Sequence, residues 1–129
     1  MKRMSLRKFG RLVTRVIETL PEELKPYLDN VVVDVEEEPG ERLLRDQGFT
    51  AEEIAAGESL YGLFAPLPLD DEALEITDVP HRIIIFKRPL EEDFPDPQEL
   101  HREIRKTVIH ELAHHFGLNE RDLEKLGLD

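Results

Sequence analysis

Two histidines stand four residues apart in the stretch HELAHHFG, which runs from His110 to Gly117. On a helix, side chains at positions i and i+4 lie on one face about a turn apart, so His110 and His114 can bind a single zinc ion. Glu111 follows the first histidine, and its carboxylate points beside the metal, where it can take a proton from zinc-bound water. The spacing therefore predicts a zinc site with its own general base.

A third ligand is expected near the two histidines, because only fifteen residues follow His114. Gly117 allows the backbone to reverse after the helix, and a residue three positions further on can then point back at the metal. That residue is Glu120. Asp122 is the main alternative, and Glu124 or a water molecule are others. The sequence has no cysteine, so the ligands of any metal site must be histidines and carboxylates.

A long helix must carry these side chains, and the pattern predicts one from Pro97 to Phe116. Its apolar residues gather on one side, and both histidines project from the other. The core side carries Ile109, Leu112, Ala113 and Phe116. Gly117 suits the left-handed conformation that ends many helices, and Asn119 is a good N-cap for a short last helix.

The remaining elements are predicted from apolar spacing and from turn residues. An N-terminal helix ends at Pro21, and its apolar stripe consists of Leu6, Phe9, Val13, Val16, Ile17 and Leu20. Strands are predicted within 30–38, at 60–64 and over 81–90, where Ile83 to Phe86 precede Pro89. Short helical turns within 41–59, with a capping box formed by Thr50 and Glu53, are expected to lie over the sheet. The proline-rich segment 90–100 is expected to be a connector.

The pattern H-E-x-x-H-x-x-G-x-x-E, from His110 to Glu120, resembles the extended zinc motif of the metzincins with an acidic third ligand. The chain resembles the small bacterial zincin-like metallopeptidases more closely. This resemblance implies His110, His114 and Glu120 as ligands and Glu111 as base. It also implies an α+β minimal zincin fold, in which a small mixed sheet packs on the active-site helix and substrate lies antiparallel along an edge strand. The methionine-containing turn of metzincins is missing, since no methionine follows residue 4.

Composition limits the other functions that the chain can have. With 129 residues, 40% hydrophobic and 36% charged, we expect one soluble domain spanning 1–129, without a membrane span and located in the cytoplasm. A net charge of −12 argues against nucleic acid as a partner. Basic residues cluster in the N-terminal helix, which we expect to dock on the acidic remainder. Few amides and no cysteine give the chain a composition like that of thermophile proteins.

The sequence thus predicts a zinc-dependent metallopeptidase that cleaves peptides or unfolded proteins. An extended substrate binds by adding a strand to a sheet edge, and the segment 82–90 is the expected edge, with 60–64 as the alternative. The competing hypothesis is a non-catalytic module, stabilised by zinc, that recruits a protein partner through an exposed sheet edge. A weaker third hypothesis is a nucleic-acid contact through Arg7, Lys8 and Arg11.

Overall fold

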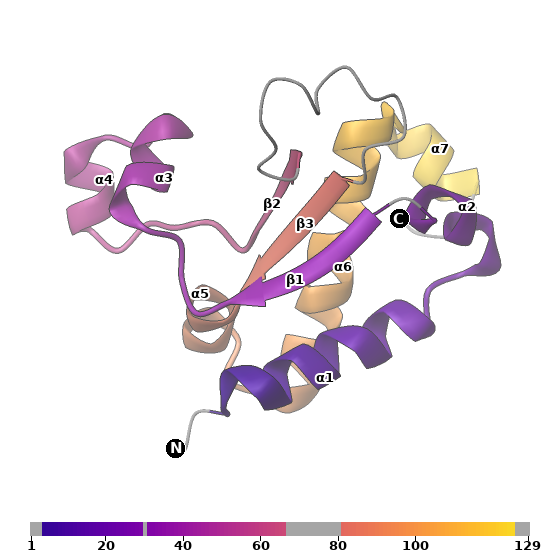
Figure 1. The fold of residues 1–129 in the computed structure, drawn as a ribbon, viewed down its shortest axis with the longest axis horizontal. Helices are drawn as coiled ribbons and strands as arrows, with labels where there is room; N and C mark the ends of the chain where they lie inside the picture. Colours follow the sequence, from indigo (N-terminus) through magenta and orange to yellow (C-terminus); the bar gives the residue numbers. More distant parts are fainter. Residues whose placement is uncertain (1–3, 30, 67–80, 126–129) are drawn as a thin grey trace.

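The computed structural model describes residues 4–29, 31–66 and 81–125, which form a mixed α+β fold (Figure 1). The elements follow in the order α1 (Leu6–Glu18), η1 (Glu22–Leu24), α2 (Lys25–Leu28), β1 (Val31–Glu36), α3 (Glu41–Asp46), α4 (Ala51–Ala55), β2 (Gly62–Pro66), β3 (His81–Phe86), α5 (Lys87–Asp93), α6 (Pro97–Phe116) and α7 (Glu120–Lys125). The predicted fold class is confirmed. None of the helices in these ranges is both long and apolar enough to cross a membrane.

The three strands form one small mixed sheet with the order β1-β3-β2. β1 is parallel to β3, whereas β2 is antiparallel to it. The prediction that the third strand is an edge was wrong, because β3 is central and has a partner on each side. Four consecutive buried residues, Ile83 to Phe86, explain this position, since a strand covered on both faces is apolar without alternation. The two edges of the sheet are β1 and β2.

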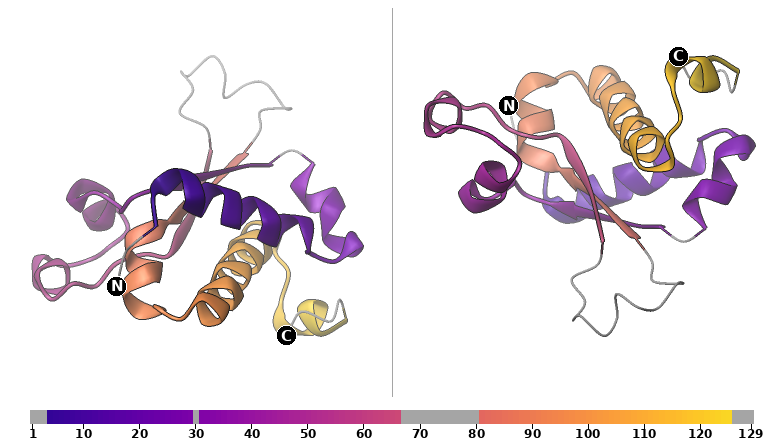
Figure 2. Two further views of the ribbon diagram at one scale, coloured as in Figure 1. Left: turned by 90° about the horizontal axis from the view of Figure 1, so that it is seen from below. Right: turned by 90° about the horizontal axis from the view of Figure 1, so that it is seen from above.

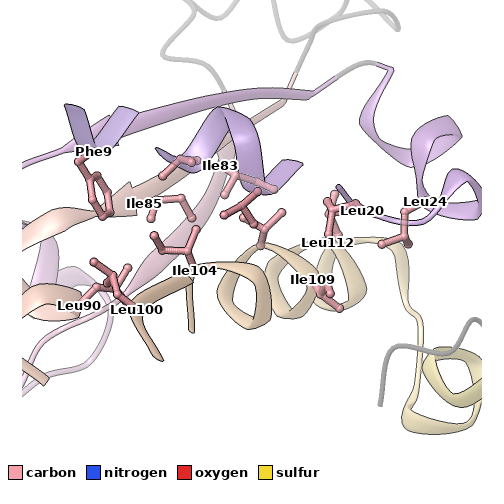
Figure 3. Packing of buried hydrophobic residues seen from close by; sticks show 13 residues of the cluster. Phe9, Leu20, Leu24, Ile83, Ile85, Leu90, Leu100, Ile104, Ile109 and Leu112 are labelled. Atoms are coloured by element: carbon pink, nitrogen blue, oxygen red, sulfur yellow. The ribbon is translucent and has the colours of Figure 1, made fainter. Parts of the chain in front are cut away.

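Helices α1 and α6 pack against one face of this sheet and against each other (Figure 2). The register pairs Val33 with Ile83 and Val35 with Ile85, so these side chains share that face. A single core cluster results, drawn in part in Figure 3. It contains Phe9, Val13, Val16, Leu20, Leu24, Ile83, Ile85, Leu90, Leu100, Ile104, Val108, Ile109 and Leu112. Each such side chain contributes roughly 1.5–3 kcal/mol when fully buried.

Helix α1 forms where the apolar spacing predicts it. The Ser5 hydroxyl caps its first turn by accepting a hydrogen bond from the Lys8 N–H at 3.1 Å. Phe9, Val13 and Val16 are buried. The helix therefore places most of its apolar stripe on the core, whereas Leu6 at its start is 37% exposed, and it leaves its basic residues in solvent.

Between β1 and β2 the chain forms two short helices, α3 and α4. The predicted capping box is confirmed, because the Thr50 hydroxyl accepts from the Glu53 N–H and the Glu53 carboxylate accepts from the Thr50 N–H. The expectation that this insertion covers the sheet was wrong. In both figures it projects to one side, beyond the end of the strands (Figures 1 and 2).

Helix α5 begins at Lys87, within the segment 81–90 predicted to be a strand, and runs to Asp93, within the predicted connector, so both predictions were wrong there. Pro89 is compatible with the helix because it lies in the first turn, where N–H groups have no acceptor within the helix and the missing N–H of proline costs no hydrogen bond. Lys87 at the start of α5 is only 3% exposed, and its Nζ lies 2.7 Å from Glu37 and 2.8 Å from Glu91. Burial lowers the pKa of Lys87, but the hydrogen bonds to these two carboxylates outweigh it and raise the pKa. This ion cluster around the buried Lys87 joins α5 to the end of β1.

Candidate functional site

Helix α6 carries the two candidate metal-binding histidines on its exposed side. The helix begins at Pro97, where the Asp96 carboxylate accepts from the Glu99 N–H at 3.0 Å, and it ends at Gly117 with φ of 68°. Both ends agree with the prediction. His110 and His114 are exposed, whereas the apolar residues of the opposite side are buried. The two imidazoles thus project from one face of a helix that the core holds from behind.

Phe116 does not follow the prediction for the core side of α6. Its side chain is 39% exposed, and its ring packs against Tyr27 of α2 with ring centroids 5.1 Å apart. Phe116 is the last residue of α6, and the adjacent His115 is exposed as well. The buried stripe of α6 therefore stops at Ala113.

Glu111 lies half-buried between α6 and the edge strand β2. Its Oε2 accepts a hydrogen bond from the main-chain N–H of Phe64 at 3.1 Å. Tyr61 and Phe86 are a hydrogen-bonded pair of the antiparallel ladder, so the backbone of Phe64, three residues further on, faces the outer edge of β2. The outer edge of β2 therefore holds the candidate base.

The surroundings of Glu111 change its proton affinity. Burial raises the pKa of Glu111, and the Phe64 N–H together with the nearby His114 and His110 offset part of that rise. The net direction is upward. A carboxylate with a raised pKa is a stronger proton acceptor than an exposed one, as a general base requires.

Close packing of α6 on β2 brings these groups together. Gly62 faces Thr107 of α6, and a Cβ atom added at Gly62 would lie 2.7 Å from the Thr107 Cγ2. Thr107 is buried, and its hydroxyl donates to the Glu103 carbonyl at 2.7 Å. A glycine at this position therefore lets the strand approach the helix closely enough for Phe64 to reach Glu111.

Aromatic rings surround the end of α6 beside the histidine pair. The ring of Phe64 stacks on His115 with centroids 3.7 Å apart and planes inclined by 14°. His81 at the start of β3 lies 4.5 Å from His115 and 5.4 Å from Phe64. These three residues come from three elements, so no spacing in the sequence connected them. The stack fixes the orientation of Phe64, whose N–H holds the candidate base.

The candidate third ligands lie on α7, after the turn at Gly117. Asp122 forms a reciprocal cap with Asn119: its carboxylate accepts from the Asn119 N–H at 2.9 Å, and the Asn119 side chain accepts from the Asp122 N–H at 2.8 Å. The predicted N-cap is thus confirmed. Glu120 is exposed. Within residues 4–29, 31–66 and 81–125, no three His, Asp or Glu side chains lie close enough together to hold a metal ion.

The side chains that α6 itself supplies are nevertheless suitable zinc ligands. His110 and His114 are exposed on one face, and neither has a hydrogen-bond partner in the described part of the chain. Two imidazoles with a nearby carboxylate are ligands that zinc accepts. Glu103 and Thr107, earlier on the same helix, bond to Lys106 and to the helix backbone and not to either imidazole.

Known proteins resemble this chain in family and in fold. A family model described as zincin-like metallopeptidase matches residues 28–128. Among solved structures, a conserved hypothetical protein from Thermus thermophilus superposes with a TM-score of 0.54 and 24% sequence identity, covering 88% of this chain and 94% of that chain. At that identity the similarity concerns the fold alone. No curated protein matches the chain.

Proposed function

Because this chain belongs to the zincin-like metallopeptidase family, we propose that it is a zinc-dependent peptidase with Glu111 as its general base. The observation that carries the proposal is the half-buried Glu111 carboxylate, which the Phe64 N–H holds beside two exposed imidazoles on the same helix. His110 and His114 are the proposed zinc ligands, with Glu120 as the third.

Proton transfer is the part of the reaction that this chain's own residues perform. Zinc, when bound, supplies a Lewis acid that lowers the pKa of water and polarises a peptide carbonyl. Glu111 accepts the proton that water loses as it attacks the carbonyl carbon, and then gives that proton to the nitrogen of the leaving amine. The Phe64 N–H directs the carboxylate before reaction, so that little reorganisation is needed.

Glu120 is preferred to Asp122 as third ligand for a local reason. The Asp122 carboxylate caps α7 by accepting from Asn119, so binding zinc would cost that cap, typically about 1 kcal/mol. Glu120 has no hydrogen-bond partner among the described residues and loses nothing by turning toward the histidines. Zinc affinity should therefore fall strongly in Glu120→Gln and little in Asp122→Asn, which keeps an acceptor oxygen for the cap.

The proposed substrate is an extended peptide or an unfolded protein that lies along the outer edge of β2. An edge strand offers main-chain hydrogen bonds to any extended sequence, and on this edge the N–H of Phe64 is already bonded to the base. An extended peptide on β2 would thus bring its own carbonyl groups close to Glu111.

Metal content and peptide cleavage test the proposal together. Protein purified without a histidine tag should hold about one zinc per chain, and His114→Ala should lose it. Glu111→Gln should keep the zinc but lower cleavage of a fluorescence-quenched peptide library by about 10²–10⁴-fold. Glu103 is another half-buried glutamate of α6, so Glu103→Gln is the matched control and should retain activity.

Two results would contradict the peptidase. A wild type that takes up no zinc even when zinc is added would remove the metal site altogether. The protein would instead be a zinc-stabilised binding module if the zinc-loaded wild type cleaves no peptide and if wild type and Glu111→Gln bind extended peptides with equal affinity.

A further inference from the structure

Helix α1 carries a row of arginines that the proposed peptidase does not use. Arg7, Arg11 and Arg15 recur at every fourth residue and are exposed. None of them forms an ion pair within the described ranges, although the chain has a net charge of −12. Helix α1 does pack on the rest of the protein, as expected, but it does so through its apolar residues and not through ion pairs between these arginines and acidic residues. Its charged side remains without a partner among the described residues.

This row borders a groove of about 570 Å³ between α1 and the edge strand β1. Val33, Asp34 and Val35 line the groove on the strand side. The helix approaches β1 closely, since a Cβ atom at Gly10 would lie 3.4 Å from Val35 Cγ2. Asp34 is the acidic residue of the groove, and Arg82 of β3 is its partner at 3.7 Å. The arginines are therefore not neutralised from within the groove.

The outer edge of β1 is available for pairing. β1 bonds to β3 on its inner side, and no backbone bond joins it to any other described segment. An edge with unpaired N–H and C=O groups is a template for an added strand. Because β1 and β2 are opposite edges of the sheet, a strand added here would not touch Glu111.

The spacing of the arginines matches that of an extended chain. Four residues of helix advance about 6 Å, and two residues of strand advance about 6.6 Å. Side chains on one face of an added strand alternate with those on the other. Three arginines spaced by four can therefore face three acidic side chains spaced by two, over a length of about 12–13 Å.

From this match we propose that the groove between α1 and β1 binds an extended acidic segment of another protein. The segment adds to β1 as an edge strand, and its carboxylates, at alternate positions, pair with Arg7, Arg11 and Arg15. The main-chain bonds accept any extended sequence, so the arginine row supplies the selectivity. This surface is independent of the proposed zinc site.

Fluorescence anisotropy with a labelled, end-blocked peptide of alternating Glu and Thr tests the proposal on the full-length protein. The alternating peptide should bind, and a peptide of the same composition with all Glu before all Thr should bind more weakly. Arg7→Gln/Arg11→Gln should raise the Kd by roughly five- to tenfold, the effect of losing two charge-assisted contacts. Arg42→Gln/Arg102→Gln removes the same charge from exposed positions elsewhere and should leave the Kd within about twofold.

Backbone methylation of the peptide tests strand addition separately from charge. Successive residues of a strand direct their N–H groups to opposite edges, so methylating either the Glu or the Thr nitrogens blocks one edge only. One of the two methylated peptides should lose binding, and the other should retain it.

Several results would overturn the proposal. These are no binding, equal binding of both methylated peptides, equal weakening by the two double variants, or tighter binding of a single-stranded oligonucleotide of equal charge. The last result would identify a nucleic-acid surface instead. Dimerisation of the protein that the alternating peptide does not reverse would identify a second copy of the chain as the occupant.

Discussion

Replacing Gly62 by Ala should destabilise the protein more than the addition of one methyl group suggests. The new Cβ would lie 2.7 Å from Thr107 Cγ2, about 0.7 Å short of the 3.4 Å at which ordinary contact begins. Thr107 cannot rotate away without losing the 2.7 Å hydrogen bond from its hydroxyl to Glu103, and a β-branched side chain has few other rotamers. We therefore expect β2 to move away from α6, at a cost of about 1–3 kcal/mol.

Urea unfolding measures this cost. With an m value of about 2 kcal/mol/M, a loss of about 2 kcal/mol lowers the midpoint by about 1 M while m stays unchanged. Gly10→Ala is the matched control, because its Cβ meets Val35 at 3.4 Å and a helix prefers Ala to Gly by about 1 kcal/mol. That variant should be neutral or more stable than the wild type.

Thr107→Ser identifies the source of the strain, since it removes Cγ2 and keeps the hydroxyl. In the double variant most of the Gly62→Ala penalty should disappear, giving a favourable interaction energy of about 1–2 kcal/mol. A Gly62→Ala variant as harmless as Gly10→Ala, or single penalties that simply add, would show that Gly62 and Thr107 do not conflict. The same shift of β2 would stretch the 3.1 Å bond from Phe64 to Glu111, so cleavage should fall together with stability.

Two further predictions concern Lys87 and Tyr61. Lys87→Met leaves Glu91 without its cationic partner and should lower the free energy of unfolding by about 3 kcal/mol, whereas Arg88→Met removes only exposed pairs and should cost under about 1 kcal/mol in the same urea experiment. Equal losses of unfolding free energy in the two variants would show that the buried ion pairs of Lys87 matter no more than the exposed pairs of Arg88. Burial, together with its hydrogen bond to Asp93, raises the pKa of Tyr61 from 10.0 to about 12. The folded state thus holds this proton more tightly than the unfolded chain does, so the stability that it contributes is present below pH 10 and is lost as pH rises toward 12. Thermal midpoints of Tyr61→Phe should therefore decline less than those of the wild type between pH 10 and 12, and parallel curves would contradict this assignment.

Elements with local signals at both ends could be predicted from the sequence almost to the residue. Helix α6 has Asp96 and Pro97 at its start and Gly117 at its end, and each acts through the backbone of its own turn. α5 was missed because Pro89, usually a sign of irregular structure, lies in the first turn, where the helix tolerates it.

Contacts between distant segments could not be predicted in this way. The bond from Phe64 to Glu111 joins residues 47 apart, and it depends on the register of β2 and on the close approach at Gly62. Likewise, the run of isoleucines indicated a strand within 81–90, but its central place in the sheet depends on the strands that pair with it on each side. The residues of the candidate site could therefore be predicted from a short stretch of sequence, whereas the hydrogen bond that joins Glu111 to the sheet edge could not.

The packing of α1 on α6 has a consequence for how the protein is made. About 80 residues separate the end of α1 from the start of α6, so on the ribosome the stripe of Phe9, Val13 and Val16 waits roughly 4–16 s for its partner. During that time the apolar stripe is available to chaperones. The helix that finally covers it is also the one that carries His110 and Glu111. The core and the proposed site are thus completed in one step, when the last third of the chain has been made.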